Sequence, residues 1–291
     1  MRSLFHLGTA LFMSQFLAAQ TLNDVSYLTR SGLYGSARYT SMAGAFGALG
    51  GDLTAISDNP AASSVFLNTE VGGSVNFQNR QNQGIFSGTT QSTEDEDFYF
   101  DQFGAVFVFN NTNEESPWSR VSAAINVNRI ASFDQNAFVS GTNTSGIQDY
   151  FLYYADGIAF EDIQLYDDET VSDIYRFLGD EVGYGGQQAF LGYQSYIIDP
   201  LSNDPSERSY VSNINSRQFR HNLDIVNQGF HRKTSFNFSG LYKNKLHLGA
   251  NINRHRLEFM NDQNFFEGDQ DLDSFVYDVN FNNSLISYGE G

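Results

Sequence analysis

The sequence predicts an all-β protein: a transmembrane antiparallel β-barrel, incomplete in this chain, with a small N-terminal hatch. Three observations predict it. Several segments alternate apolar and polar residues, and aromatic residues make up 15% of the chain. After the N-terminal signal, no segment reaches the ~20 apolar residues that a membrane helix needs. Barrel strands alternate in this way and concentrate aromatic side chains in girdles at the two membrane interfaces.

Residues 1–20 have the order of a secretory signal peptide. Arg2 supplies the positive start, residues 4–17 are mostly apolar, and Leu17-Ala18-Ala19 offers small residues for cleavage next to Gln20. We therefore expect export through a cleaved signal and residence in the outer membrane of a Gram-negative bacterium. The absence of Cys suits passage through an oxidising periplasm.

Residues 21–68 are predicted to form the hatch, because they are rich in small residues and show little strand alternation. Gly44, Gly47, Gly50 and Gly51 permit tight backbone there. From residue 70 the period becomes two, so residues 69–291 are predicted to be the first part of the barrel.

Six strands are predicted. In residues 70–78, Val71, Gly73, Val75 and Phe77 share one face and polar or small residues the other. The clearest unit is a hairpin that turns at Lys243-Asn244-Lys245, with one apolar and one polar face. The remaining strands are expected at residues 98–109, 118–129 and 274–288, beside the hairpin arms at 233–242 and 246–259.

The connections alternate between short and long. Residues 110–117 and 243–245 are short turns, which we place on the periplasmic side. The long, mostly acidic extracellular segments are expected at residues 80–97, 130–230 and 260–273, with an acidic helix near 159–179. This asymmetry is typical of outer-membrane barrels, whose smallest bacterial members have about eight strands. We therefore expect that the chain stops before the barrel closes, or that other strands come from elsewhere.

The formal net charge of -18 argues against a nucleic-acid partner. The acidic clusters are interpreted as solvated loops. Asp269, Asp271 and Asp273 alternate like the start of a calcium loop, but Ser274 replaces the required Gly and Asn280 the bidentate Glu. No metal site and no cofactor are predicted.

Residues 35–62 read GSARYTSMAGAFGALGGDLTAISDNPAA. This segment resembles the start of the FadL family of outer-membrane transporters for long-chain fatty acids and aromatic hydrocarbons. The chain departs from the family pattern at Ala43, Gly51 and Asp58. The family's hatch signature is matched by Gly35, Arg38, Met42, Gly44, Ala45, Phe46, Asp52, Asn59, Pro60 and Ala61.

The resemblance implies passive transport of a hydrophobic small molecule across the outer membrane, in contact with membrane lipid and lipopolysaccharide. The ligand would bind in an apolar pocket gated by the hatch and leave sideways between strands. By position, Leu22, Val25, Tyr27 and Leu28 would line that pocket, or would pack the hatch against the barrel wall. Asn59, Pro60 and Ala61 would hold the hatch at the periplasmic end, or form a plain turn.

Three other functions are alternatives to transport. Some FadL-like barrels of type IX secretion systems carry a similar hatch and act as shuttle or anchor components, so a secretion-system protein is an alternative partner. Haem uptake would need an axial ligand, for which His221, His231, His247 and His255 are available. An enzyme is not predicted and no catalytic residue is assigned, because no nucleophile elbow, phosphate-binding loop or zinc spacing is present.

Overall fold

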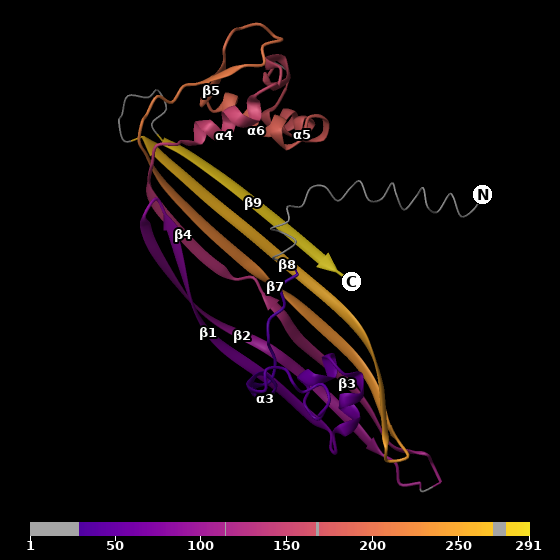
Figure 1. Ribbon diagram of the computed structural model, residues 1–291. Helices are drawn as coiled ribbons and strands as arrows, with labels where there is room; N and C mark the ends of the chain where they lie inside the picture. Colours follow the sequence, from indigo (N-terminus) through magenta and orange to yellow (C-terminus); the bar gives the residue numbers. More distant parts are fainter. Residues whose placement is uncertain (1–28, 114, 167–168, 270–277) are drawn as a thin grey trace, which may run out of the picture.

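The computed structural model describes residues 29–113, 115–166, 169–269 and 278–291. It is mostly β, and its main sheet is antiparallel with the strand order β1-β2-β3-β7-β8-β9. A group of helices lies at one end of the long strands, and a compact N-terminal unit lies toward the other end (Figure 1). No helix in the described ranges is long and apolar enough to cross a membrane.

The strands contain the segments predicted at residues 70–78, 98–109, 118–129, 233–242 and 246–259, and several extend beyond them. Of the strand predicted at residues 274–288, residues 278–288 lie in β9 and residues 274–277 lie outside the described residues. The turn between β7 and β8 lies at residues 243–245, as the sequence predicts. A fourth strand, β4, was not predicted and pairs with the upper half of β7. The bounds are β1 Glu70–Phe86, β2 Thr89–Asn110, β3 Trp118–Ser132, β4 Gln135–Asn143, β7 Phe219–Tyr242, β8 Leu246–Asp269 and β9 Asp278–Glu290.

The prediction of loops at residues 80–97 and 260–273 was wrong over most of both ranges. β1 and β2 continue as a paired hairpin to a turn at Ser87-Gly88, where both residues have positive φ. β8 continues to Asp269. The β1–β2 extension is mostly polar on both faces, as the pairs Arg80–Asp95 and Asn79–Glu96 illustrate. Hydrophobic alternation does not reveal such strands, because it requires one apolar face.

Residues 130–230, predicted to be a long irregular segment, instead include the end of β3, all of β4 and the first part of β7, and the chain between β4 and β7 forms a cap of short helices and strands. The helix predicted near residues 159–179 was partly right. That range includes η4 and most of α5, but these are two separate helices. The cap has its own apolar core, which includes Phe151, Ile163 and Phe190 and continues onto Phe219 of β7. Its elements are α4 Ile147–Ala155, η4 Phe160–Ile163, α5 Val171–Glu181, α6 Tyr184–Gln194, β5 Ile198–Pro200 and β6 Tyr210–Ser212.

The N-terminal unit, residues 35–66, contains only short helices: α3 Ala37–Ser41, η2 Thr54–Ser57 and η3 Pro60–Val65. We refer to it as the hatch unit. Its core includes Phe46 and Ile56 and continues onto Val106 of β2 and Ala124 of β3. The hatch unit is therefore packed directly on one face of the sheet, which we call the inner face.

The sheet is open. Within the described residues no strand pairing joins β1 to β9, so no closed barrel is present. The transmembrane barrel that the sequence predicts therefore stays a prediction.

Candidate functional site

The outer face of the sheet carries exposed apolar side chains across five neighbouring strands. Val71, Phe103 and Phe238 are 63%, 62% and 63% exposed. Strand pairing aligns these positions, since Ile125 lies opposite Phe236 and Phe236 opposite Ile252. We call this surface the apolar band; its exposed members are Val71, Val75, Phe77, Phe98, Phe100, Phe103, Phe107, Phe109, Val121, Ile125, Phe236, Phe238, Leu246, Leu248 and Ile252.

The inner face behind the apolar band is polar, because successive side chains on a strand point to opposite faces. Side-chain amides from three strands there donate to backbone carbonyls of the hatch unit. These donors satisfy carbonyl groups of η2, of η3 and of the residue before η2. The contacts are Asn126 to Leu53 O (2.7 Å), Asn128 to Thr54 O (3.4 Å), Asn251 to Ile56 O (2.8 Å) and Asn237 to Pro60 O (2.7 Å), and Lys233 Nζ adds a fifth to Ser57 O (3.0 Å).

Two hatch serines extend this contact. The Ser63 hydroxyl lies 2.5 Å from that of Ser239, and the Ser64 hydroxyl lies 2.6 Å from Nδ1 of His247. The backbone approaches β8 so closely that a Cβ atom at Gly249 would lie 2.3 Å from the Pro60 carbonyl oxygen. Only glycine fits at position 249 while the hatch unit is docked.

The predicted hatch-motif residues shape the hatch unit from within. Gly35 and Gly44 take positive φ values of 140° and 76°. Phe46 is fully buried, and the Arg38 guanidinium lies 4.7 Å from the centre of its ring. Met42, in contrast, is 40% exposed and ends α3.

The acidic and Asn-Pro-Ala parts of the motif are hydrogen-bonded within the same unit. Asp52 accepts from the Ser36 hydroxyl (2.6 Å) and from the Thr54 amide (2.8 Å). Asn59 caps η3 by accepting from the Ala61 amide (3.0 Å), and it donates to the Gly47 carbonyl (2.6 Å). Pro60 begins η3, where it needs no amide donor. Leu22, Val25, Tyr27 and Leu28, predicted to line a ligand pocket, lie outside the described residues.

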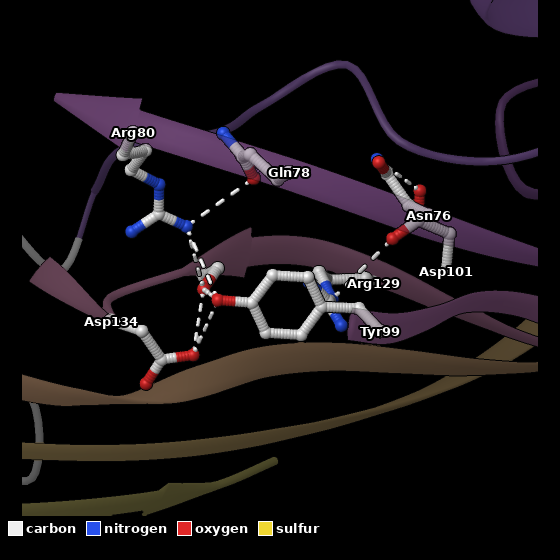
Figure 2. Close-up of polar contacts among 8 residues, drawn as sticks. Asn76, Gln78, Arg80, Tyr99, Asp101, Arg129 and Asp134 are labelled. Carbon is white, nitrogen blue, oxygen red and sulfur yellow. Dashed lines mark hydrogen bonds and ion pairs between the residues drawn. The ribbon is translucent and has the colours of Figure 1, made fainter. Parts of the chain in front are cut away.

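A polar cluster occupies the inner face halfway along the strands (Figure 2). Nη2 of Arg80 lies 3.3 Å from the Tyr99 hydroxyl, which donates to Asp134 (3.0 Å). Asp134 also accepts from the Gly229 amide of β7 (2.9 Å). Asp134 lies in the break between β3 and β4, so the cluster fixes the point where the sheet bends and β4 takes over the pairing with β7.

Arg129 lies beside this cluster, where the β2–β3 pairing ends at Gln102–Asn128. Its guanidinium stacks 3.6 Å from the centre of the Tyr99 ring, and its Nε lies 3.7 Å from Oδ1 of Asp101, with both side chains 3% exposed. A buried pair of this kind is weak evidence for stability, but removing one partner would leave the other charge uncompensated. Arg129 therefore bridges β2 and β3 where their backbones separate.

A cavity of about 400 Å³ lies beneath the cap on the upper inner face. Glu267 of β8, 2% exposed, lies at its wall and accepts from the Ile147 amide at the start of α4 (2.7 Å). Nε2 of His221 lies 2.8 Å from the same Glu267 oxygen. The cavity is lined by Ser145, Gly146, Ile147, Tyr150, Tyr184, His221, Leu223, Gln263, Phe265, Glu267, Phe281 and Asn283.

The sequence did not identify this cavity. The one available signal was the alternation of Phe265 and Glu267 on one strand face, which places a carboxylate among apolar residues. The four candidate haem-ligating histidines do not gather at one site, and each has a ring nitrogen in contact with a neighbouring side chain. His231 and His255 face each other at 3.0 Å, whereas His221 and His247 contact Glu267 and Ser64.

Comparisons with family models, with curated proteins and with solved structures found no match to this chain. The resemblance to the FadL family is thus carried by the motif at residues 35–62. Arguments about function depend on that motif and on the geometry described above.

Proposed function

We propose that this chain forms part of the wall of an outer-membrane β-barrel, with the hatch unit inside its lumen. The observation that carries the proposal is the opposite character of the two sheet faces. The outer face exposes the apolar band, whereas the inner face binds the hatch unit through buried polar side chains. Monomeric soluble proteins rarely expose an apolar surface of this extent.

The dimensions of the apolar band suit a bilayer. On β8 it runs from Leu246 to Ile252, six steps that correspond to about 20 Å at ~3.4 Å per residue. The apolar zone of outer-membrane barrels is ≈ 25 Å tall and bordered by aromatic side chains. Trp118 and Tyr242 pack edge to face, 5.2 Å apart, at the end of the band, and charged Arg254 and Arg256 follow beyond its other end.

We further propose that the protein passively transports a hydrophobic small molecule. An apolar cavity offers such a molecule ~25 cal/mol for each Å² that it buries, which a water-filled pore does not. The cavity beneath the cap supports this function, and the likeness of the hatch motif to the FadL family supports a gate at the other end. The proposal assigns no catalytic step.

The test is to cross-link the hatch unit to the sheet. The chain has no Cys, so the double variant Ser63→Cys/Ser239→Cys can form one disulfide between hatch unit and wall. The two hydroxyl oxygens that it replaces are 2.5 Å apart. In a Gram-negative host that displays the complete protein, we expect oxidation to abolish uptake of a fluorescent fatty acid and of a labelled aromatic hydrocarbon, and reduction to restore it.

Each single variant under the same oxidation is the matched control and should transport at an unchanged rate. Uptake that continues when the disulfide is complete would overturn transport through the hatch. A stoichiometric protein partner on a barrel without uptake would assign the protein to secretion instead.

A further inference from the structure

The cavity beneath the cap has an aromatic wall. Tyr150 and Tyr184 of the cap face Phe265 of β8 and Phe281 of β9 across it. Tyr150 and Phe281 meet edge to face with centroids 6.2 Å apart. The cavity volume, about 400 Å³, lies within the ~300–1,000 Å³ of small-molecule sites. A planar aromatic molecule of two rings matches this volume and could add further edge contacts.

Glu267 gives the cavity its polarity. The Ile147 amide donates to its Oε2, and His221 Nε2 lies 2.8 Å from the same oxygen. Within the described part of the chain, no hydrogen bond reaches the second oxygen, Oε1. A hydrogen bond to a charged acceptor is worth more than one between neutral groups. Oε1 is therefore suited to a ligand that donates.

Among the described residues that line the cavity there is no Lys and no Arg. A ligand carboxylate would meet no opposite charge there and would lie near the Glu267 carboxylate. Like charges in a poorly solvated site repel each other strongly. The cavity thus opposes the ionised head group of a fatty acid.

We propose that this cavity binds an uncharged aromatic molecule that carries a hydrogen-bond donor, of the phenol or naphthol class, and selects against aromatic and aliphatic carboxylates. The donor binds Oε1 of Glu267 and the rings pack against Phe265, Phe281 and Tyr150. This inference rests on the proposed function, because it names the class of compound that the transporter collects.

The experiment uses three ligands with one skeleton: 2-naphthol, 2-methoxynaphthalene, which lacks the donor, and 2-naphthoate. Each is titrated by its fluorescence against the complete protein in lipid nanodiscs, with empty nanodiscs subtracted. We expect 2-naphthol to bind roughly 10- to 100-fold more tightly than 2-methoxynaphthalene, and 2-naphthoate to bind most weakly. Equal affinities for the first two, or tightest binding of 2-naphthoate, would overturn the proposal.

Two variants assign the binding to this cavity. Glu267→Gln keeps an oxygen for the Ile147 amide but presents N–H donors toward the ligand, so the affinity ratio of 2-naphthol to 2-naphthoate should fall at least tenfold. Leu223→Trp fills the cavity and should abolish binding of all three ligands. Leu248→Trp, on the exposed outer face, is the matched control and should leave binding unchanged.

Hydrogen exchange of the cap shows whether each variant is folded. If the cap is intact and Glu267→Gln leaves the affinity ratio unchanged, the inference is wrong. The experiments on binding and on uptake can refute the two proposals separately. Selective naphthol binding without uptake would refute the proposed function alone, whereas uptake without selective binding would refute this inference alone.

Discussion

Replacing Asn126 with Ala should release the hatch unit from the sheet. The Asn126 side chain is fully buried, and its Nδ2 donates to Leu53 O (2.7 Å) and to Asn128 Oδ1 (2.8 Å). Asn126→Ala leaves the Leu53 carbonyl of the docked hatch unit without its donor, a loss of about 1–3 kcal/mol. The equilibrium between docked and released hatch unit should then shift roughly 5- to 150-fold toward release, since ~1.4 kcal/mol is a factor of ten.

Hydrogen exchange read by mass spectrometry measures this shift. The amides of Asp58 and Asn59 both donate to the Ala55 carbonyl, at 3.1 and 2.9 Å, inside the hatch unit and close to the lost contact. Their protection should fall by the same factor as docking weakens, provided that undocking precedes exchange. Amides in the β7–β8 ladder should keep their protection, because those strands pair along their whole length.

The matched control is Asn79→Ala, an exposed asparagine on the outer face of β1. It should leave hatch exchange unchanged. The reasoning is refuted if Asn126→Ala leaves the protection of Asp58 and Asn59 at the wild-type level, or if the control lowers it equally.

Three further predictions concern other parts of the molecule. Gly249→Val should prevent docking of the hatch unit with the strands intact, measured by the same exchange experiment, because its Cβ would lie 2.3 Å from the Pro60 carbonyl oxygen. Asn59→Ala removes the cap of η3 and the bond to Gly47 O, and should destabilise the hatch unit by about 1–2 kcal/mol, measured by chemical denaturation. Burial, followed by repulsion from Asp162, raises the pKa of Tyr210 to about 12. The neutral phenol is therefore favoured by folding, so this contribution is complete below pH ~10 and is lost as pH rises through about 12. Tyr210→Phe should reduce the alkaline loss of cap stability in a denaturation series at rising pH.

The lower half of the sheet could be predicted from the sequence because one of its faces is apolar. Phe236 and Phe238 alternate with Asn237 and Ser239, and this alternation identified β7 between residues 233 and 242. The upper half of β7, from Phe219, was missed since His221 interrupts the apolar face that carries Leu223 and Ile225, and Val226 breaks the alternation on the other face. The helices α4 and α6 of the cap were also missed. α6 contains three glycines, Gly185, Gly186 and Gly192, and glycine is a weak helix former.

The hatch contacts illustrate why a site is harder to predict than its parts. The glycines and the Asn-Pro pair of the motif signal local backbone geometry, and they do shape turns and caps within the hatch unit. The polar face that holds Asn126 and Asn251 could also be read from alternation. Their partners could not, because Leu53 and Ile56 lie 73 and 195 residues away along the chain. The Ile147–Glu267 contact beneath the cap spans 120 residues and was hidden for the same reason.

The inner face changes from partly apolar near the cap to polar beside the hatch unit, and this change constrains how a transported ligand could release the hatch unit. Near the cap this face presents Leu223 and Phe265, whereas beside the hatch unit it presents Lys233 and Asn237, which are already bound to hatch carbonyls. An aromatic ligand gains little by moving onto that polar surface, and one hydroxyl group does not replace the five donors to the hatch carbonyls. If the protein transports such ligands, the energy that releases the hatch unit must therefore be supplied at a place other than the asparagine contacts. The chain just before the hatch unit qualifies, since the Gly32 amide donates to the Ile130 carbonyl (2.9 Å) and connects it to the C-terminal end of β3.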